Sequence, residues 1–117
     1  MNLEHAIEKH AEWKLRFRTA MSKHETLDEA VIAKDDCCEL GKWLHGDGKR
    51  RFGSLPGYLT CVARHAAFHG EAAKVAQAVN ARRYEQAESM LEGNTTYADA
   101  STAVGVAILR LKKEAGL

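Results

Sequence analysis

Histidine and cysteine side chains that can bind a transition metal stand at suggestive spacings in this chain. His65 and His69 are four residues apart in a stretch that is predicted to be helical. Residues at positions i and i+4 lie one above the other on the same face of a helix, so both imidazoles can reach one ion. Zinc accepts neutral imidazole nitrogen at roughly 2.0–2.1 Å. The pair alone is a weak signal, because two histidines at this spacing are common.

A third histidine and a cysteine strengthen the prediction. His10 lies in an amphipathic stripe with Ile7, Trp13 and Phe17, so it is expected to point inward. A buried polar group without a partner costs roughly 1–3 kcal/mol, and inward histidines that share a metal avoid this cost. Cys38 supplies a thiolate, and four protein ligands leave no position for water, which indicates a structural or sensing site and not a hydrolytic one. We therefore predict one Zn²⁺ per chain, with the ligands His10, Cys38, His65 and His69.

Helical periodicity predicts the elements that must position these residues. No stretch shows the strict alternation of a half-buried strand, so the predicted fold class is all-α, a four-helix-bundle-like domain with additional short helices. The only proline and five of the nine glycines fall between Gly41 and Gly57, where residues 46–57, with Lys49-Arg50-Arg51, are predicted to form an exposed loop. Helices are predicted over residues 3–24, 27–34, 37–45, 56–81 and 84–91, followed by a last one near residue 96.

Local signals refine two of these helices. Thr26 with Glu29 predicts a capped start for the second helix, and Thr96 with Asp99 predicts one for the last. The predicted inner stripe of the longest helix is Leu59, Val62, Ala66, His69, Ala73 and Ala76. The stripe of the last helix is narrow, which fits packing against a partner helix, in this chain or in another subunit; it consists of Tyr97, Ser101, Val104, Ile108 and Leu111.

Composition excludes several classes of protein. The 117 residues suit one domain over residues 1–117, although the sequence equally suits a domain cut from a longer protein. The net charge of +1 gives no reason to expect nucleic acid or a membrane surface as a partner. There is no apolar run of about 18 residues and no signal peptide, and the three cysteines do not suit a disulfide scaffold, so we expect a cytoplasmic protein with reduced thiols.

Three linked blocks, separated by 24 and 21 residues, carry a family resemblance: His10-Ala-Glu-Trp13, Cys38-Glu-Leu-Gly-Lys-Trp43 and His65-Ala-Ala-Phe-His69. Together they resemble the chemoreceptor zinc-binding domain. The resemblance covers residues 10–69 directly. It implies that His10, Cys38, His65 and His69 bind zinc. It also implies a small, usually homodimeric helical bundle in bacterial cytosolic signalling proteins, fused to or associated with a chemoreceptor or a diguanylate cyclase.

The resulting hypothesis is a regulatory or sensory domain without catalytic activity of its own. Zinc occupancy, oxidation of the Cys38 thiolate, or both would control the signalling output, for example in chemotaxis. Because an unperturbed histidine has a pKa near 6.5, zinc affinity is expected to fall below about that pH.

Two alternatives belong to other classes of protein. One is a non-haem di-iron helical bundle, which needs bridging carboxylates and Glu-x-x-His pairs; Glu71 and Glu85 are not placed near such a second set. The other is a plain helical dimerisation module whose histidines are ordinary core residues. An optical spectrum tests the first alternative, and stability in a strong chelator tests the second.

The neighbours of the predicted ligands have more ordinary interpretations. Gly41 is expected to permit close packing beside the site or an unusual backbone angle. Cys37 should point away from the site, either as a buried, inert thiol or as a resolving or competing thiol in oxidation, and Cys61 is expected to pack in the core. Asp35 and Asp36 are expected to form a turn, and one of them could accept the free N–H of a ligand histidine.

Overall fold

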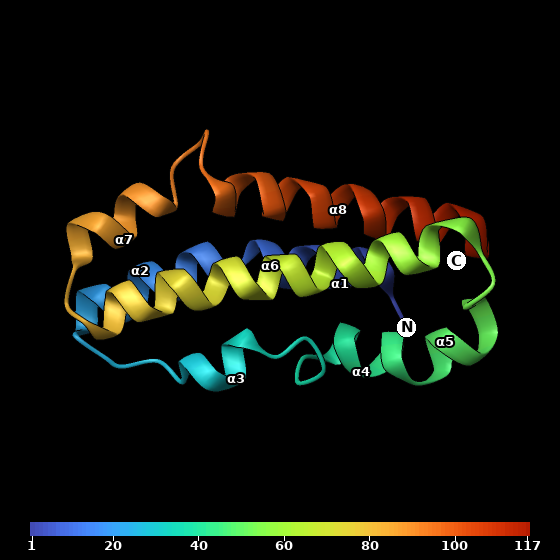
Figure 1. The fold of residues 1–117 in the computed structure, drawn as a ribbon, viewed down its shortest axis with the longest axis horizontal. Coiled ribbons are helices and arrows are strands. Elements are labelled where there is room, and N and C mark those ends of the chain that lie inside the picture. The colour runs from blue at the N-terminus through green and yellow to red at the C-terminus, as the bar shows by residue number, and fades with distance from the viewer.

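The computed structural model describes residues 1–117 as helices joined by short connections (Figure 1). Helices α1 and α2 are followed by three short helices, then by the longest helix, α6, by the short α7 and by the long α8. Their bounds are α1 Leu3–Ala11, α2 Trp13–Lys23, α3 Glu29–Ala33, α4 Glu39–His45, α5 Asp47–Phe52, α6 Pro56–Asn80, α7 Tyr84–Met90 and α8 Thr96–Ala115.

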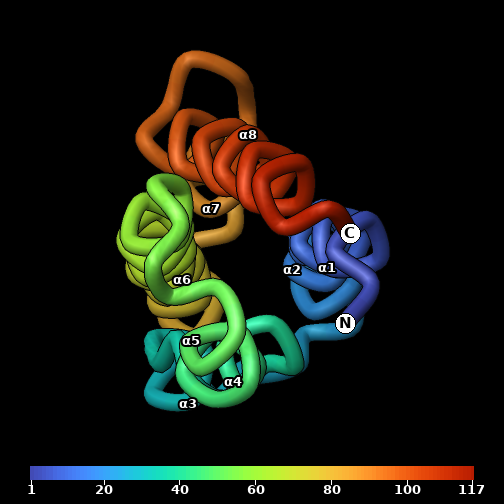
Figure 2. The backbone as a smooth tube through the Cα atoms, turned by 90° about the vertical axis from the view of Figure 1, so that its right-hand side faces the viewer, coloured from blue at the N-terminus to red at the C-terminus, as the bar shows by residue number.

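The helices form four antiparallel arms around one axis, which Figure 2 shows from the end: α1–α2, α3–α5, α6 and α8. Each arm runs opposite to the one before it, as in an up-down-up-down bundle. Helix α6 packs against α2, α3, α4, α7 and α8. The all-α, four-helix-bundle-like prediction is therefore confirmed. None of the eight helices is both long and apolar enough to cross a membrane.

The first predicted helix is present as two helices that meet at Glu12. The backbone of Glu12 stays right-handed (φ −67°, ψ −18°), so α1 and α2 continue in nearly one line. The Asn2 side chain accepts a hydrogen bond from the His5 N–H and caps α1. The helical stripe of the sequence is kept, because Leu3, His10 and Phe17 are all buried.

The start of α3 differs from the prediction. Asp28, and not Thr26, caps this helix by accepting a hydrogen bond from the Val31 N–H at 3.2 Å. The segment before α3 is held by α6, because the side chain of Asn80 at the end of α6 forms hydrogen bonds with both the N–H and the C=O of Leu27. α3 is thereby held against α6, which matters for the site below.

The prediction of an exposed loop over residues 46–57 is wrong in part, because residues 47–52 form α5. Gly48 is buried, and a Cβ there would stand 2.8 Å from the Trp43 ring, so this glycine permits close packing rather than a flexible loop. Lys49, Arg50 and Arg51 are exposed as expected, and they occupy the last turn of α5, where basic residues are favourable.

The buried faces of the two long helices agree to different extents with the stripes predicted from the sequence. Leu59 is 73% exposed and Ala66 is also exposed, so the predicted stripe of α6 is wrong at these two positions, whereas Val62 packs against the core. The helix is rich in alanine on several faces, and apolar spacing alone does not distinguish them. On α8 the predicted stripe is buried inside this chain, at Tyr97, Val104, Ile108 and Leu111. Thr95 caps α8, one residue before the predicted Thr96.

Candidate metal centre

The four predicted ligand residues meet at one point between the arms of the bundle. His10 comes from α1, Cys38 immediately precedes α4, and His65 and His69 come from α6. Their ligand atoms all lie within 4.8 Å of one another, so the group could hold one metal ion. The structure thus brings together every residue of the predicted set, and no other residue of the chain joins the group.

Cys38 is positioned by the start of α4. Its Sγ accepts a hydrogen bond from the Gly41 N–H at 3.3 Å, which makes the cysteine the cap of this helix. Sγ also lies 3.2 Å from Nε2 of His65 and 3.5 Å from Nε2 of His69. A Cβ on Gly41 would overlap the carbonyl oxygen of Asp35, so the glycine permits the close approach of the loop that carries Cys38.

The two histidines of α6 converge through the same ring nitrogen. Their Nε2 atoms are 3.0 Å apart, as the four-residue spacing predicts. His69 is oriented by α3, because its Nδ1 lies 2.9 Å from the carbonyl oxygen of Ile32. Since a carbonyl only accepts, Nδ1 carries the proton and Nε2 keeps its lone pair for the centre of the group.

His10 is oriented in the same way by its own helix. Its Nδ1 donates to the carbonyl oxygen of Ala6 at 2.8 Å, which leaves Nε2 with a free lone pair. That Nε2 is buried and has no hydrogen-bond partner. This unpaired acceptor lies beside two imidazoles and a thiol. A buried acceptor without a protein partner is expected where a bound cation supplies the missing contact. The donor set therefore fits a metal ion. Nδ1 of His65 is the other buried side-chain atom without a partner.

Burial keeps all four groups uncharged in the absence of a metal. It lowers the pKa of His10 and His69, and it lowers the pKa of His65 to about 3, with the nearby His69 and His10 acting in the same direction. Burial raises the pKa of the Cys38 thiol. At neutral pH the imidazoles are thus ready to donate lone pairs, whereas the thiol must lose a proton before it can act as a thiolate ligand.

The hydrogen-bond acceptors that orient the histidine rings differ from those predicted from the sequence. Asp35 was a candidate partner for a ligand histidine, but its carboxylate lies 3.0 Å from Nε2 of His45. Backbone carbonyls orient His10 and His69 instead, and a carbonyl leaves no mark in the sequence. Phe68, also missed, packs edge-on against His10 with ring centroids 5.3 Å apart.

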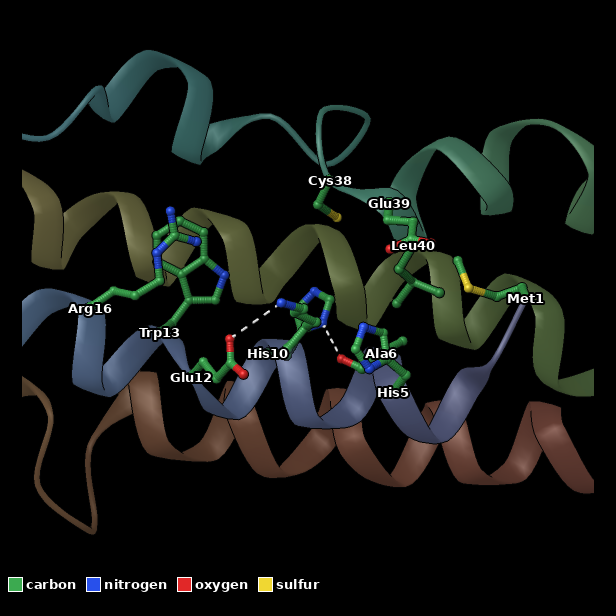
Figure 3. Close-up of a pocket in the computed structure, with 11 residues that line it drawn as sticks. Met1, His5, Ala6, His10, Glu12, Trp13, Arg16, Cys38, Glu39 and Leu40 are labelled. Carbon is green, nitrogen blue, oxygen red and sulfur yellow. Dashed lines mark hydrogen bonds and ion pairs between the residues drawn. The ribbon is translucent and has the colours of Figure 1, made fainter.

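A pocket of about 430 Å³ opens from the surface to one side of the group (Figure 3). His10 and Cys38 border it, from α1 and from the segment before α4, respectively. Its wall includes Trp13, against which the Arg16 guanidinium stacks at 4.0 Å from the ring centroid. His65 and His69 do not line this pocket.

The other two cysteines lie outside the group. Cys61 is fully buried in the hydrophobic core, as predicted, whereas Cys37 is exposed and is therefore not the buried thiol of the first interpretation. No carboxylate belongs to the group, so the structure offers no support for the di-iron alternative, which needs bridging carboxylates. Glu71 instead binds Lys74 and the hydroxyl of Thr96.

Comparison with known proteins agrees with this donor set. The family model of the chemoreceptor zinc-binding domain matches residues 10–76, which is more than half of the 117-residue chain and includes all four donors. No curated protein and no solved structure matches the chain. One thiol and three imidazoles are ligand types that zinc prefers. The chain belongs to the chemoreceptor zinc-binding domain family.

Proposed function

We propose that residues 1–117 form a single regulatory domain that binds one zinc ion per chain and has no catalytic activity of its own. The ligands are His10, Cys38, His65 and His69. The observation that carries the proposal is the convergence of these four ligand atoms, from three separate segments, within 4.8 Å. Nitrogen and sulfur donors without a carboxylate favour zinc over magnesium or calcium, which prefer oxygen.

The number of ligands supports the proposal that the domain has no catalytic activity of its own. A hydrolytic zinc site has three protein ligands and an exchangeable fourth position for water. When all four protein donors are bound, they occupy the tetrahedron and leave no position for water, so the ion in that state serves to join the segments that carry them. Those segments are α1, the loop before α4, and α6. Gain or loss of zinc is therefore expected to change how these segments pack.

Cys38 is the point at which redox chemistry would act on this packing. It is half-buried, borders the surface pocket and caps α4, whereas Cys61 is fully buried. A peroxide or hypohalous acid would add one oxygen to Sγ, giving a sulfenic acid while the oxidant is reduced by two electrons. The oxidised sulfur is a poorer ligand than a thiolate, so oxidation would weaken zinc binding and loosen the start of α4.

The output that we propose is bacterial signalling through a fused or associated chemoreceptor or diguanylate cyclase in the cytoplasm. The family membership supports this proposal. The domain content of the native gene product and of its stable partners tests it. A product without either output domain, and without a signalling partner, would contradict it.

We further propose that the domain acts as a homodimer. The predicted stripe of α8 is buried within the chain and is not available to a second subunit. The opposite face of α8 exposes Val106 and Leu109, at 62% and 45%. Sedimentation of the wild type and of a Val106→Glu, Leu109→Glu variant tests whether this face holds two chains together. A monomeric wild type would contradict the proposal.

Zinc content tests the ligand assignment. Elemental analysis of the wild type should give one zinc per chain, and Cys38→Ala should lose it. Cys37→Ala is the matched control, because Cys37 is the neighbouring residue, is exposed and lies outside the group. Stoichiometric zinc in Cys38→Ala would refute the assignment.

A second arm tests the redox proposal. The wild type and Cys37→Ala are exposed to a mild peroxide, and zinc release is followed together with near-ultraviolet circular dichroism. Both proteins should release zinc and change their signal. Unchanged zinc content and an unchanged spectrum after oxidation would contradict redox control while leaving the zinc site itself intact.

A further inference from the structure

The four donors of the centre are not held equally. Sγ of Cys38 and the Nε2 atoms of His65 and His69 form a triangle with sides of 3.2, 3.5 and 3.0 Å. Bonds of about 2.0–2.3 Å at tetrahedral angles place neighbouring ligand atoms roughly 3.3–3.6 Å apart. The triangle is therefore already close to the size that one zinc ion needs. His10 offers a ring nitrogen within 4.8 Å of these atoms, and its Nε2 hydrogen-bonds to none of them.

The hydrogen bonds that orient the donor side chains also differ, although they do not follow the same order, because Nδ1 of His65 has no partner at all. His69 is tied to α3 through the carbonyl of Ile32, and Cys38 is tied to the first turn of α4 through Gly41. His10 is tied only to Ala6, one turn back in its own helix. It is also the penultimate residue of α1, close to Glu12, where α1 and α2 meet. No other element fixes the direction of its ring through a hydrogen bond.

The position of the larger pocket distinguishes His10 from His65 and His69. His10 and Cys38 face each other across the inner end of the 430 Å³ pocket (Figure 3). His65 and His69 are 0% and 2% exposed and lie outside this pocket. A smaller pocket of about 200 Å³, which also has Trp13 in its wall, reaches Cys38 and His69, and neither His10 nor His65 lines it. Of the three histidines in the group, only His10 lines the larger pocket, which it shares with Cys38.

We infer that His10 is the exchangeable ligand of the centre and that the pocket beside it is the route by which metal ions and small neutral donors reach the ion. This inference rests on the proposed zinc site. Cys38, His65 and His69 would hold the ion if His10 turned away, and a water molecule or a nitrogen base of the size of imidazole would then take the vacated position. The centre then responds to small coordinating molecules as well as to zinc itself.

Chemical rescue tests the inference. His10→Ala and His65→Ala remove the same side chain, but only His10 borders the larger pocket. Each variant is titrated with cobalt(II), whose visible spectrum reports tetrahedral coordination, with and without added imidazole. His10→Ala should bind cobalt at least about tenfold more weakly than the wild type and regain both affinity and spectrum in imidazole. His65→Ala should not be rescued.

The outcomes separate the inference from the proposed function. A wild type that binds neither cobalt nor zinc overturns the zinc site itself. A wild type that binds metal, together with a His10→Ala variant that imidazole does not restore, overturns the inference alone. Equal rescue of His65→Ala would also overturn it, because the two positions would then be equally accessible.

A kinetic test keeps all four ligands in place. Lys9 and Lys23 are both exposed lysines, but only Lys9 lines the pocket. Lys9→Trp should narrow the opening, and Lys23→Trp is its matched control. Zinc uptake and its release to a chromogenic chelator are followed by stopped flow. Lys9→Trp should slow both rates by the same factor and leave the affinity unchanged. Rates equal to those of Lys23→Trp would overturn the inference.

Discussion

Sγ of Cys38 lies 3.2 Å from Nε2 of His65, although the two residues are 27 positions apart in the chain. Burial keeps this thiol and this imidazole uncharged, since it raises the pKa of Cys38 and lowers that of His65 to about 3. The contact therefore joins two neutral groups until a cation binds. Zinc binding at neutral pH needs the release of one proton, from the thiol, and of none from the imidazoles.

The pH dependence of zinc affinity follows from this proton. We expect affinity to rise about tenfold per pH unit from about pH 6.5 to pH 8, because one thiol proton is released per ion. Competition titrations with a chromogenic chelator measure the slope, and Cys38→Ala should flatten it. The sequence alone predicted a histidine-controlled loss near pH 6.5, whereas burial moves histidine protonation to lower pH. A flat profile for the wild type, or a two-proton slope, would contradict this account.

The stability of the metal-free protein should depend on pH through the histidines. The pKa values of His10, His65 and His69 are lowered in the folded state, so below about pH 6.5 the unfolded chain binds more protons than the folded one. The free energy of unfolding should then fall as the pH drops, by up to about 1.4 kcal/mol per pH unit for each histidine. Urea denaturation in chelator, from about pH 7.5 to pH 5.5, measures this slope. His5→Gln, at an exposed position, should leave it unchanged.

Substitution of Gly41 should disturb the centre although no ligand residue is replaced. A Cβ at this position would overlap the carbonyl of Asp35, so Gly41→Ala must displace the loop that carries Cys38. We expect a loss of about 1–3 kcal/mol in unfolding free energy and weaker zinc binding. Gly105→Ala is the control, because a Cβ there meets no atom within 4 Å and alanine favours the helix by about 0.5–1 kcal/mol. Equal stability changes in the two variants would show that the contact has no effect.

Several parts of the site could be predicted because local spacing fixes them. The i, i+4 pair of His65 and His69 follows from helical geometry, and the inward direction of His10 follows from its place in an apolar stripe. The proximity of Cys38 to them was predicted from ligand chemistry and from the three-block resemblance. The role of Gly41 as a close-packing residue was one of two predicted readings, and its φ is not positive.

Other parts could not be predicted because tertiary contacts decide them. Asp28 displaces Thr26 as the cap of α3, in a segment that Asn80 holds from α6. The glycines around residue 48 led to the prediction of a loop, but Gly48 instead allows α5 to pack against Trp43. In α6, alanines on several faces hide the buried stripe, so Leu59 was predicted to lie in the core and is exposed.

Thiol labelling should distinguish the three cysteines. Cys37 is exposed, Cys38 is half-buried, and burial raises the pKa of Cys61 to about 11. Mass spectrometry after alkylation should show label on Cys37 alone in the zinc-loaded protein, on Cys37 and Cys38 after chelation, and on all three after unfolding, because coordination masks a thiolate. Equal labelling of Cys38 with and without zinc would contradict its role as a ligand.

X-ray absorption at the zinc edge tests the central claim most directly, because it counts the atoms bound to the ion. We predict one sulfur at about 2.3 Å and three nitrogens at about 2.0–2.1 Å, the latter with the outer-shell scattering of imidazole rings. Cys38→Ala should lose the sulfur contribution, and Cys37→Ala should keep it. A wild-type spectrum with no sulfur, with two sulfurs, or with fewer than three imidazoles would contradict a centre built from His10, Cys38, His65 and His69.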